Sequence, residues 1–130
     1  MSVRYNSLRT VEGQLTTAEV NAGKVVVPGH TGRTLTVVDA WVRAIGGAAG
    51  SNTSVDVTDS VTGTIVAVFT RAGLTQNAIL RAGTATTGVA ANLGASLGAG
   101  QGIKVANVGT AMDTATALDY CISYVVDQTP

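Results

Sequence analysis

The stretch ATALDYCISYVVD at residues 115–127 decides the fold class, because large apolar residues alternate along it with small or polar ones. Successive side chains of a β-strand point to opposite faces of the sheet. A strand here would gather its large side chains on one face, namely Leu118, Tyr120, Ile122, Tyr124 and Val126. The pattern predicts a core strand near the C-terminal end of the chain.

A second alternating stretch, SVDVTDSV at residues 54–61, predicts another strand. Val55, Val57 and Val61 would share one face and polar residues the other, so we expect the polar face to contact water. A Thr-Gly turn signal follows at residues 62–63. Residues 64–70 are therefore predicted to return antiparallel as the second strand of a hairpin.

Similar short runs recur from Leu15 onward, separated by glycine-rich turn signals at residues 28–32, 46–50 and 98–102. A further short strand is predicted at residues 77–80, and residues 89–93 form either a strand or a loop. Val, Thr, Gly and Ala make up more than half of the chain, a bias that favours sheets and tight turns. The pattern is typical of an antiparallel sandwich or barrel.

The chain before Leu15 has a different character. Residues 1–14 are mostly polar, include Arg4, Tyr5 and Arg9, and show no sustained period. We predict a short N-terminal arm at residues 1–14, followed by one β domain at residues 15–130. The arm is either a frayed terminus or a segment that becomes ordered on a neighbouring molecule.

The charge balance excludes several classes of partner. Eight basic residues offset eight acidic ones, and the charged fraction of 12% is about half the usual value. We therefore expect no nucleic-acid binding, which requires clustered basic residues, and no run of about 20 apolar residues suggests a membrane span. The N-terminus lacks the apolar run of a signal peptide, so synthesis in the cytosol is expected. Weakly charged surface tends to associate, which favours an assembly.

No pattern in the sequence predicts catalysis, a cofactor or a metal site. His30 lies in a Pro-Gly turn without a nucleophile motif, and the glycine run at residues 98–102 lacks the Lys-Ser or Lys-Thr of a phosphate loop. Asp56 and Asp59 would point to opposite faces of one strand. Cys121 is the one cysteine of the chain, which excludes an intrachain disulfide. We predict that the protein is not an enzyme.

Trp41 is the most informative single residue. In the run at residues 38–44, Asp39, Trp41 and Arg43 would share one face, opposite a face of Val38 and alanine or valine residues. Trp and Arg are enriched at the energetic centres of interfaces, so this trio is a candidate interface. The alternative is that Trp41 is covered by its own sheet or by the N-terminal arm.

Four segments together resemble a known family. They are VVVPGHTGRTLTVVDAWVRAIGG at residues 25–47, VDVTD at 55–59, LGAGQGIKV at 97–105 and the closing strand at 120–126. Their layout is similar to that of the jelly-roll decoration, or cement, proteins of tailed-bacteriophage heads. The resemblance implies an all-β, two-sheet antiparallel β-sandwich of jelly-roll type with about eight strands.

The resemblance also implies a function. Such a protein would be a homotrimer on the outer surface of the virion, made in the host cytoplasm, where it bridges subunits of the major capsid protein. In the working hypothesis, the arm, including Arg4, Tyr5 and Arg9, touches the capsid or a neighbouring subunit while sheet faces form the trimer. The alternatives are a tail, head-fibre or adaptor component of the virion and a β-sandwich module that binds a host glycan.

Overall fold

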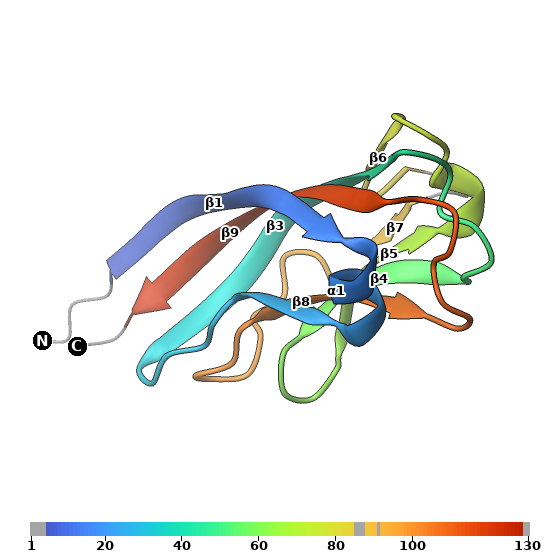
Figure 1. Ribbon diagram of the computed structural model, residues 1–130. Coiled ribbons are helices and arrows are strands. Elements are labelled where there is room, and N and C mark those ends of the chain that lie inside the picture. Colours follow the sequence, from blue (N-terminus) through green and yellow to red (C-terminus); the bar gives the residue numbers. More distant parts are fainter. Residues whose placement is uncertain (1–4, 85–87, 91, 129–130) are drawn as a thin grey trace, which may run out of the picture.

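The computed structural model describes residues 5–84, 88–90 and 92–128, and side chains within residues 7–127 of those ranges. Figure 1 shows the elements in chain order: β1 (Tyr5–Thr16), α1 (Thr17–Ala22), β2 (Lys24–Val27), β3 (Arg33–Ile45), β4 (Ser54–Asp59), β5 (Ile65–Thr70), the short 3₁₀ turn η1 (Arg71–Gly73), β6 (Ile79–Arg81), β7 (Gly88–Ala90), β8 (Ile103–Val108) and β9 (Ala117–Gln128).

The strands form two antiparallel sheets with the order β1-β9-β3-β6 and β2-β8-β4-β5-β7. Four antiparallel pairs are nested in sequence, from β4–β5 at the centre through β3–β6 and β2–β8 to β1–β9. A long hairpin wound in this way into two sheets is a jelly roll. The prediction of an all-β, two-sheet sandwich is confirmed, and β7 brings the described residues to nine strands by extending the second sheet.

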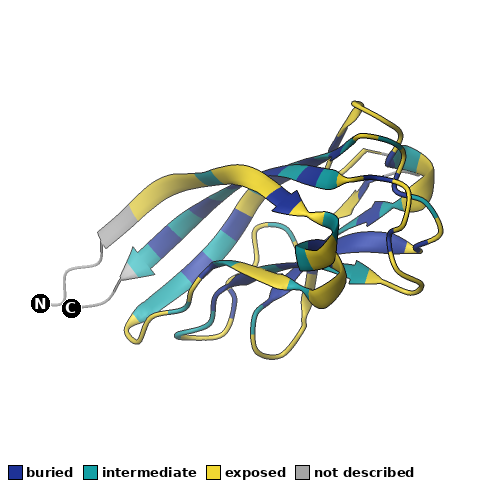
Figure 2. Ribbon diagram, in the orientation of Figure 1, coloured by how far each residue is buried: buried dark blue, intermediate teal, exposed yellow. Residues whose placement is uncertain are grey.

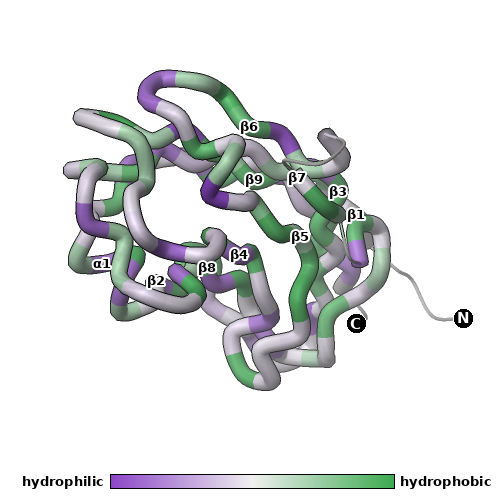
Figure 3. The backbone as a smooth tube through the Cα atoms, turned by 90° about the vertical axis from the view of Figure 1, so that its right-hand side faces the viewer, coloured by the Kyte–Doolittle hydropathy of each residue, from purple (hydrophilic) through white to green (hydrophobic). Residues whose placement is uncertain are grey.

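The core lies between the sheets, which Figure 3 shows as two layers, with β2, β8 and β4 below β6, β9 and β3. The alternation that predicted a core strand at residues 115–127 is confirmed, because the five large side chains of β9 are all buried. They meet Phe69, Val55, Val57 and Val66 in one continuous cluster. The predicted hairpin is also present, because β4 pairs with β5 across the turn at residues 60–64.

The segment predicted as an arm is instead a sheet strand from Tyr5 onward. β1 pairs with β9 in an unbroken register from Tyr5 opposite Gln128 to Thr16 opposite Ala117. It lies at the edge of its sheet, and residues 7–10 are exposed, as the yellow colour of β1 in Figure 2 shows. An edge strand with so little buried surface needs no alternating pattern, which is why its sequence resembles an irregular segment.

The polar face predicted to contact water in β4 is buried instead. Ser54, Asp56 and Thr58 are 4%, 5% and 9% exposed. β4 is an interior strand between β8 and β5, and Asp56 lies opposite Ala106 and Val68. The Ser54 hydroxyl donates a hydrogen bond of 2.8 Å to the Asp56 carboxylate, and burial raises the pKa of Asp56.

A short helix was not predicted between β1 and β2. α1 begins after Thr16, whose side chain accepts a hydrogen bond from the Glu19 amide while the Glu19 carboxylate accepts one from the Thr16 amide. This reciprocal pair is a capping box. The helix packs against β8 and β1, and Val20 is its buried residue.

Candidate functional site

The sheet β1-β9-β3-β6 has an outer face, turned away from the core, that carries the trio singled out in the sequence. Asp39, Trp41 and Arg43 of β3 lie on it, because their partners in β9 alternate with the buried side chains of that strand. We define the outer face by Leu8, Thr10, Glu12, Gln14, Asp39, Trp41, Arg43, Ile79, Arg81, Asp119, Cys121, Ser123 and Val125.

Trp41 lies near the centre of the outer face and is half-buried. Its neighbours across the sheet are Cys121 of β9 and Arg81 of β6. It also lines an open depression of about 310 Å³ together with Glu12, Gly13, Asp119 and Tyr120. The neighbouring strands, including β1, therefore flank the indole ring and leave part of it accessible to solvent.

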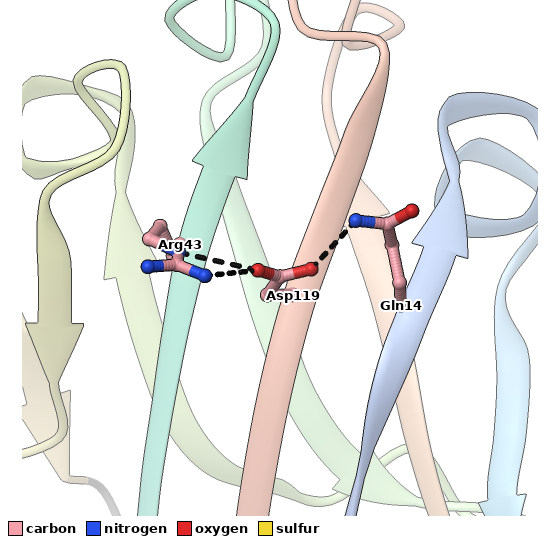
Figure 4. Close-up of polar contacts among 3 residues, drawn as sticks. All are labelled: Gln14, Arg43 and Asp119. Carbon is pink, nitrogen blue, oxygen red and sulfur yellow. Dashed lines mark hydrogen bonds and ion pairs between the residues drawn. The ribbon is translucent and has the colours of Figure 1, made fainter.

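Asp119 links three strands of the outer face, as Figure 4 shows. Arg43 donates hydrogen bonds of 3.2 Å from Nε and 2.6 Å from Nη2 to Asp119 Oδ2. Gln14 Nε2 donates one of 2.8 Å to Asp119 Oδ1. The bonds from Arg43 and Gln14 hold the pKa of the Asp119 carboxyl below its usual value of 3.8.

Asp39 forms a looser ion pair on the same face, with 3.7 Å between Asp39 Oδ2 and Arg81 Nη1. The register of β3 against β9 shifts between Val37 and Asp39. This irregularity corrects the assignment of Val38, which was predicted to share the buried face of Ala40 but is exposed. A bulge of this kind turns one residue out of the alternation.

Cys121 lies beside Trp41 and has no sign of reactivity. Burial, and then the carboxylates of Glu12 and Asp39, raise the pKa of the Cys121 thiol. A raised pKa leaves little thiolate at neutral pH, so the residue acts as a small packing group.

The interface candidates near the N-terminus do not join Asp39, Trp41 and Arg43 on the outer face. Arg4 and the side chain of Tyr5 lie outside the described residues. Arg9 lies opposite Tyr124 of β9, on the inner side of the sheet, and lines a pocket with His30 and Arg33. The structure therefore does not place Arg9 with Trp41, and no spacing in the sequence indicated that these three basic residues would converge.

Other kinds of site find no support in the described part of the chain. Its residues include no group of three His, Cys, Asp or Glu side chains able to hold a metal ion. A groove of about 380 Å³ between the loops at residues 59–64 and 92–101 has no aromatic side chain among its described lining residues on which a sugar ring would stack. No helix in the described residues has the length and apolar character needed to cross a bilayer.

Comparison with known proteins finds similarity among solved structures. No family model matches the chain, and no curated protein matches it. A chain of the structure titled "Cyanophage Pam1 capsid asymmetric unit" is similar over 98% of this chain and 86% of its own length, with 15% sequence identity and a TM-score of 0.44. A similarity of this strength does not establish a shared function.

Proposed function

We propose that the protein is a structural component of a phage virion, a decoration or cement protein that forms a homotrimer and binds major capsid subunits on the outer surface of the head. The layout of strands and turns that resembles jelly-roll decoration proteins supports this role. The jelly-roll fold alone does not, because the same fold also serves lectins and cupins.

The observation that carries the proposal is the composition of the outer face. Arg43 is paired with Asp119 and Arg81 with Asp39, so the charges around Trp41 are largely neutralised. Exposed apolar side chains flank them, Ile79 on β6 and Leu8 on β1. Aromatic and arginine residues within a face of low net charge are typical of a protein interface. We assign the contacts within the trimer to this face.

Cementing then follows from mass action. A protein that binds only the assembled lattice stabilises that lattice by a free energy that grows with the ratio of its free concentration to its Kd. A trimer presents three copies of each weak contact, and the linked contacts raise the overall affinity without any single strong one. A weakly charged protein is suited to this arrangement, because close approach of several subunits then causes little repulsion.

The first test measures oligomeric state by light scattering after size-exclusion chromatography. Wild type should be a trimer, and Ile79→Asp should be a folded monomer, because Ile79 is 58% exposed and its replacement leaves the core intact. Val61→Asp is the matched control, since Val61 is 73% exposed in the β4–β5 turn and should remain trimeric. Trp41→Ala should also lose the trimer, whereas a large fall in its melting temperature with the trimer intact would contradict the assignment.

The second test measures binding to heads of the virus that encodes the chain. The protein should sediment with assembled heads and not with free major capsid subunits. Sedimentation with tails instead would favour the tail, fibre or adaptor role, and a monomer that binds host saccharide would favour the glycan module. Either result would overturn the proposal.

A further inference from the structure

The basic pocket lies between the two sheets, on the inner side of β1, β9 and β3. Figure 1 shows that these strands extend together toward the end at which β1 begins and β9 ends. The pocket encloses about 200 Å³, with Arg9, His30 and Arg33 around buried Val27, Leu35 and Tyr124. This volume is below the range of about 300–1,000 Å³ that is usual for small-molecule sites and suits a single inserted side chain.

The charge of the pocket is unbalanced. The lining includes no acidic side chain among the described residues. Arg9 and Arg33 form no ion pair with a described residue, in contrast to Lys24, Arg43 and Arg81. In a chain with equal numbers of acidic and basic residues, two arginines from distant segments therefore face one hollow that has no counter-charge among the described residues. Guanidinium groups in this position favour a carboxylate from another molecule.

The loop that carries His30 is held in place by close backbone packing. A Cβ at Gly29 would overlap the Gly100 carbonyl oxygen, and one at Gly102 would overlap the Val27 carbonyl oxygen. The Arg33 carbonyl oxygen accepts a hydrogen bond of 2.9 Å from the Gly100 amide. These contacts fix the backbone of the loops at residues 28–32 and 98–102 against each other, so the His30 and Arg33 side of the pocket needs little ordering of the backbone on binding.

We propose that this pocket binds an acidic segment of the capsid lattice, in which a single Glu or Asp side chain inserts, with its carboxylate on Arg9 and Arg33 and its methylene carbons against Leu35 and Val27. The identity of the partner rests on the proposed function, whereas the chemistry of the segment rests on the pocket alone. The outer face would then hold the trimer together and the pocket would attach it to the capsid.

The chemistry is tested with a peptide probe by NMR titration of the labelled protein. Acetyl-Leu-Glu-Leu-amide should shift the amide signals of residues 27–33 and bind about tenfold more tightly than acetyl-Leu-Gln-Leu-amide. The double variant Arg9→Gln/Arg33→Gln should lose this preference. Arg71→Gln, at an exposed arginine outside the pocket, should keep it. Equal binding of both peptides, or equal shifts with inorganic phosphate, would overturn the inference.

The identity of the partner is tested on heads. The double variant should remain trimeric but lose at least about tenfold in affinity for heads, whereas Arg71→Gln should bind as wild type does. Loss of the trimer in the double variant would show that the pocket binds a second copy of the chain and would overturn the inference. If wild type binds the acidic peptide but not heads, the proposed function fails and the pocket chemistry stands. If wild type binds heads but not the acidic peptide, the pocket inference fails and the proposed function stands.

Discussion

Replacing Asp119 with alanine should destabilise the protein by about 2 kcal/mol, because Asp119 accepts hydrogen bonds from two neighbouring strands. The side chains of Arg43 and Asp119 are 37% and 16% exposed, so solvent only partly screens their pair. Exposed pairs contribute about 0.2–1 kcal/mol and bonds to charged groups about 1.5–3 kcal/mol, so we assign about 1 kcal/mol to this pair. The bond from Gln14 to the carboxylate adds about 1 kcal/mol.

The assay is equilibrium unfolding in urea of protein kept monomeric by Leu8→Asp, so that the exposures above apply, and a loss of about 2 kcal/mol then lowers the midpoint by about 1 M. A double-mutant cycle with Arg43→Ala should give a coupling of about 1 kcal/mol between Arg43 and Asp119. The matched control is the cycle between Asp39 and Arg81, whose side chains lie 3.7 Å apart and are 40% and 61% exposed. Their coupling should be near zero. Equal couplings in the two cycles would refute the reasoning.

The pH dependence gives an independent check. Because the pKa of Asp119 is lowered in the folded protein, the unfolded chain binds the proton more tightly. The stabilisation from Asp119 is therefore complete above the unfolded pKa of about 3.9 and is lost as the pH falls through the lower folded pKa. The difference in stability between wild type and Asp119→Ala should shrink over that interval. A difference that stays constant down to pH 2 would contradict the assignment of the shift.

Three further changes test the core, the buried polar face and the helix by urea unfolding. Phe69→Ala should cost about 3–5 kcal/mol, because the ring is fully buried and leaves a cavity; a loss below about 1 kcal/mol would place the ring at the surface. Burial raises the pKa of Asp56, so wild type should lose stability as the pH rises from the unfolded pKa through the raised folded pKa. Asp56→Asn should flatten this slope, and an unchanged slope would assign it to other groups. Thr16→Ala should cost about 1 kcal/mol by removing the capping box, and no loss would mean that the cap is dispensable.

The fold was predictable where burial imposes a period on the sequence. β9 lies between β1 and β3 and has one face in the core, so its alternation identified both the strand and its buried side chains. The same pattern separated Val55 and Val57 from the polar residues of β4, but it wrongly placed Val61 with these two valines, since Val61 is exposed in the turn that follows β4. It also did not reveal that the polar face is buried. A single strand carries no information about its neighbours, and burial of Asp56 depends on the sheet order.

Two elements, β1 and α1, were not predicted from the sequence, for different physical reasons. β1 is an edge strand with little buried surface, so hydrophobic period does not mark it. α1 is too short for a helical period to develop, but its start was encoded, since Thr16 and Glu19 have the spacing of a capping box. A search for that spacing would have placed a helix start between β1 and β2.

The basic pocket differs from both cases, because no local signal encodes it. Arg9 and Arg33 lie on strands that do not pair with each other, and they converge only because β9 separates β1 from β3 by one strand. The alternation of β1 then divides the two proposed surfaces, since Leu8 points to the outer face and its neighbour Arg9 to the pocket. One strand would thus contact another copy of the chain on one side and the capsid on the other.

Leu8→Asp should therefore disrupt the trimer without changing the peptide preference of the pocket. Arg9→Gln should weaken that preference and leave the trimer intact. A single variant that abolishes both would show that the two surfaces are not independent.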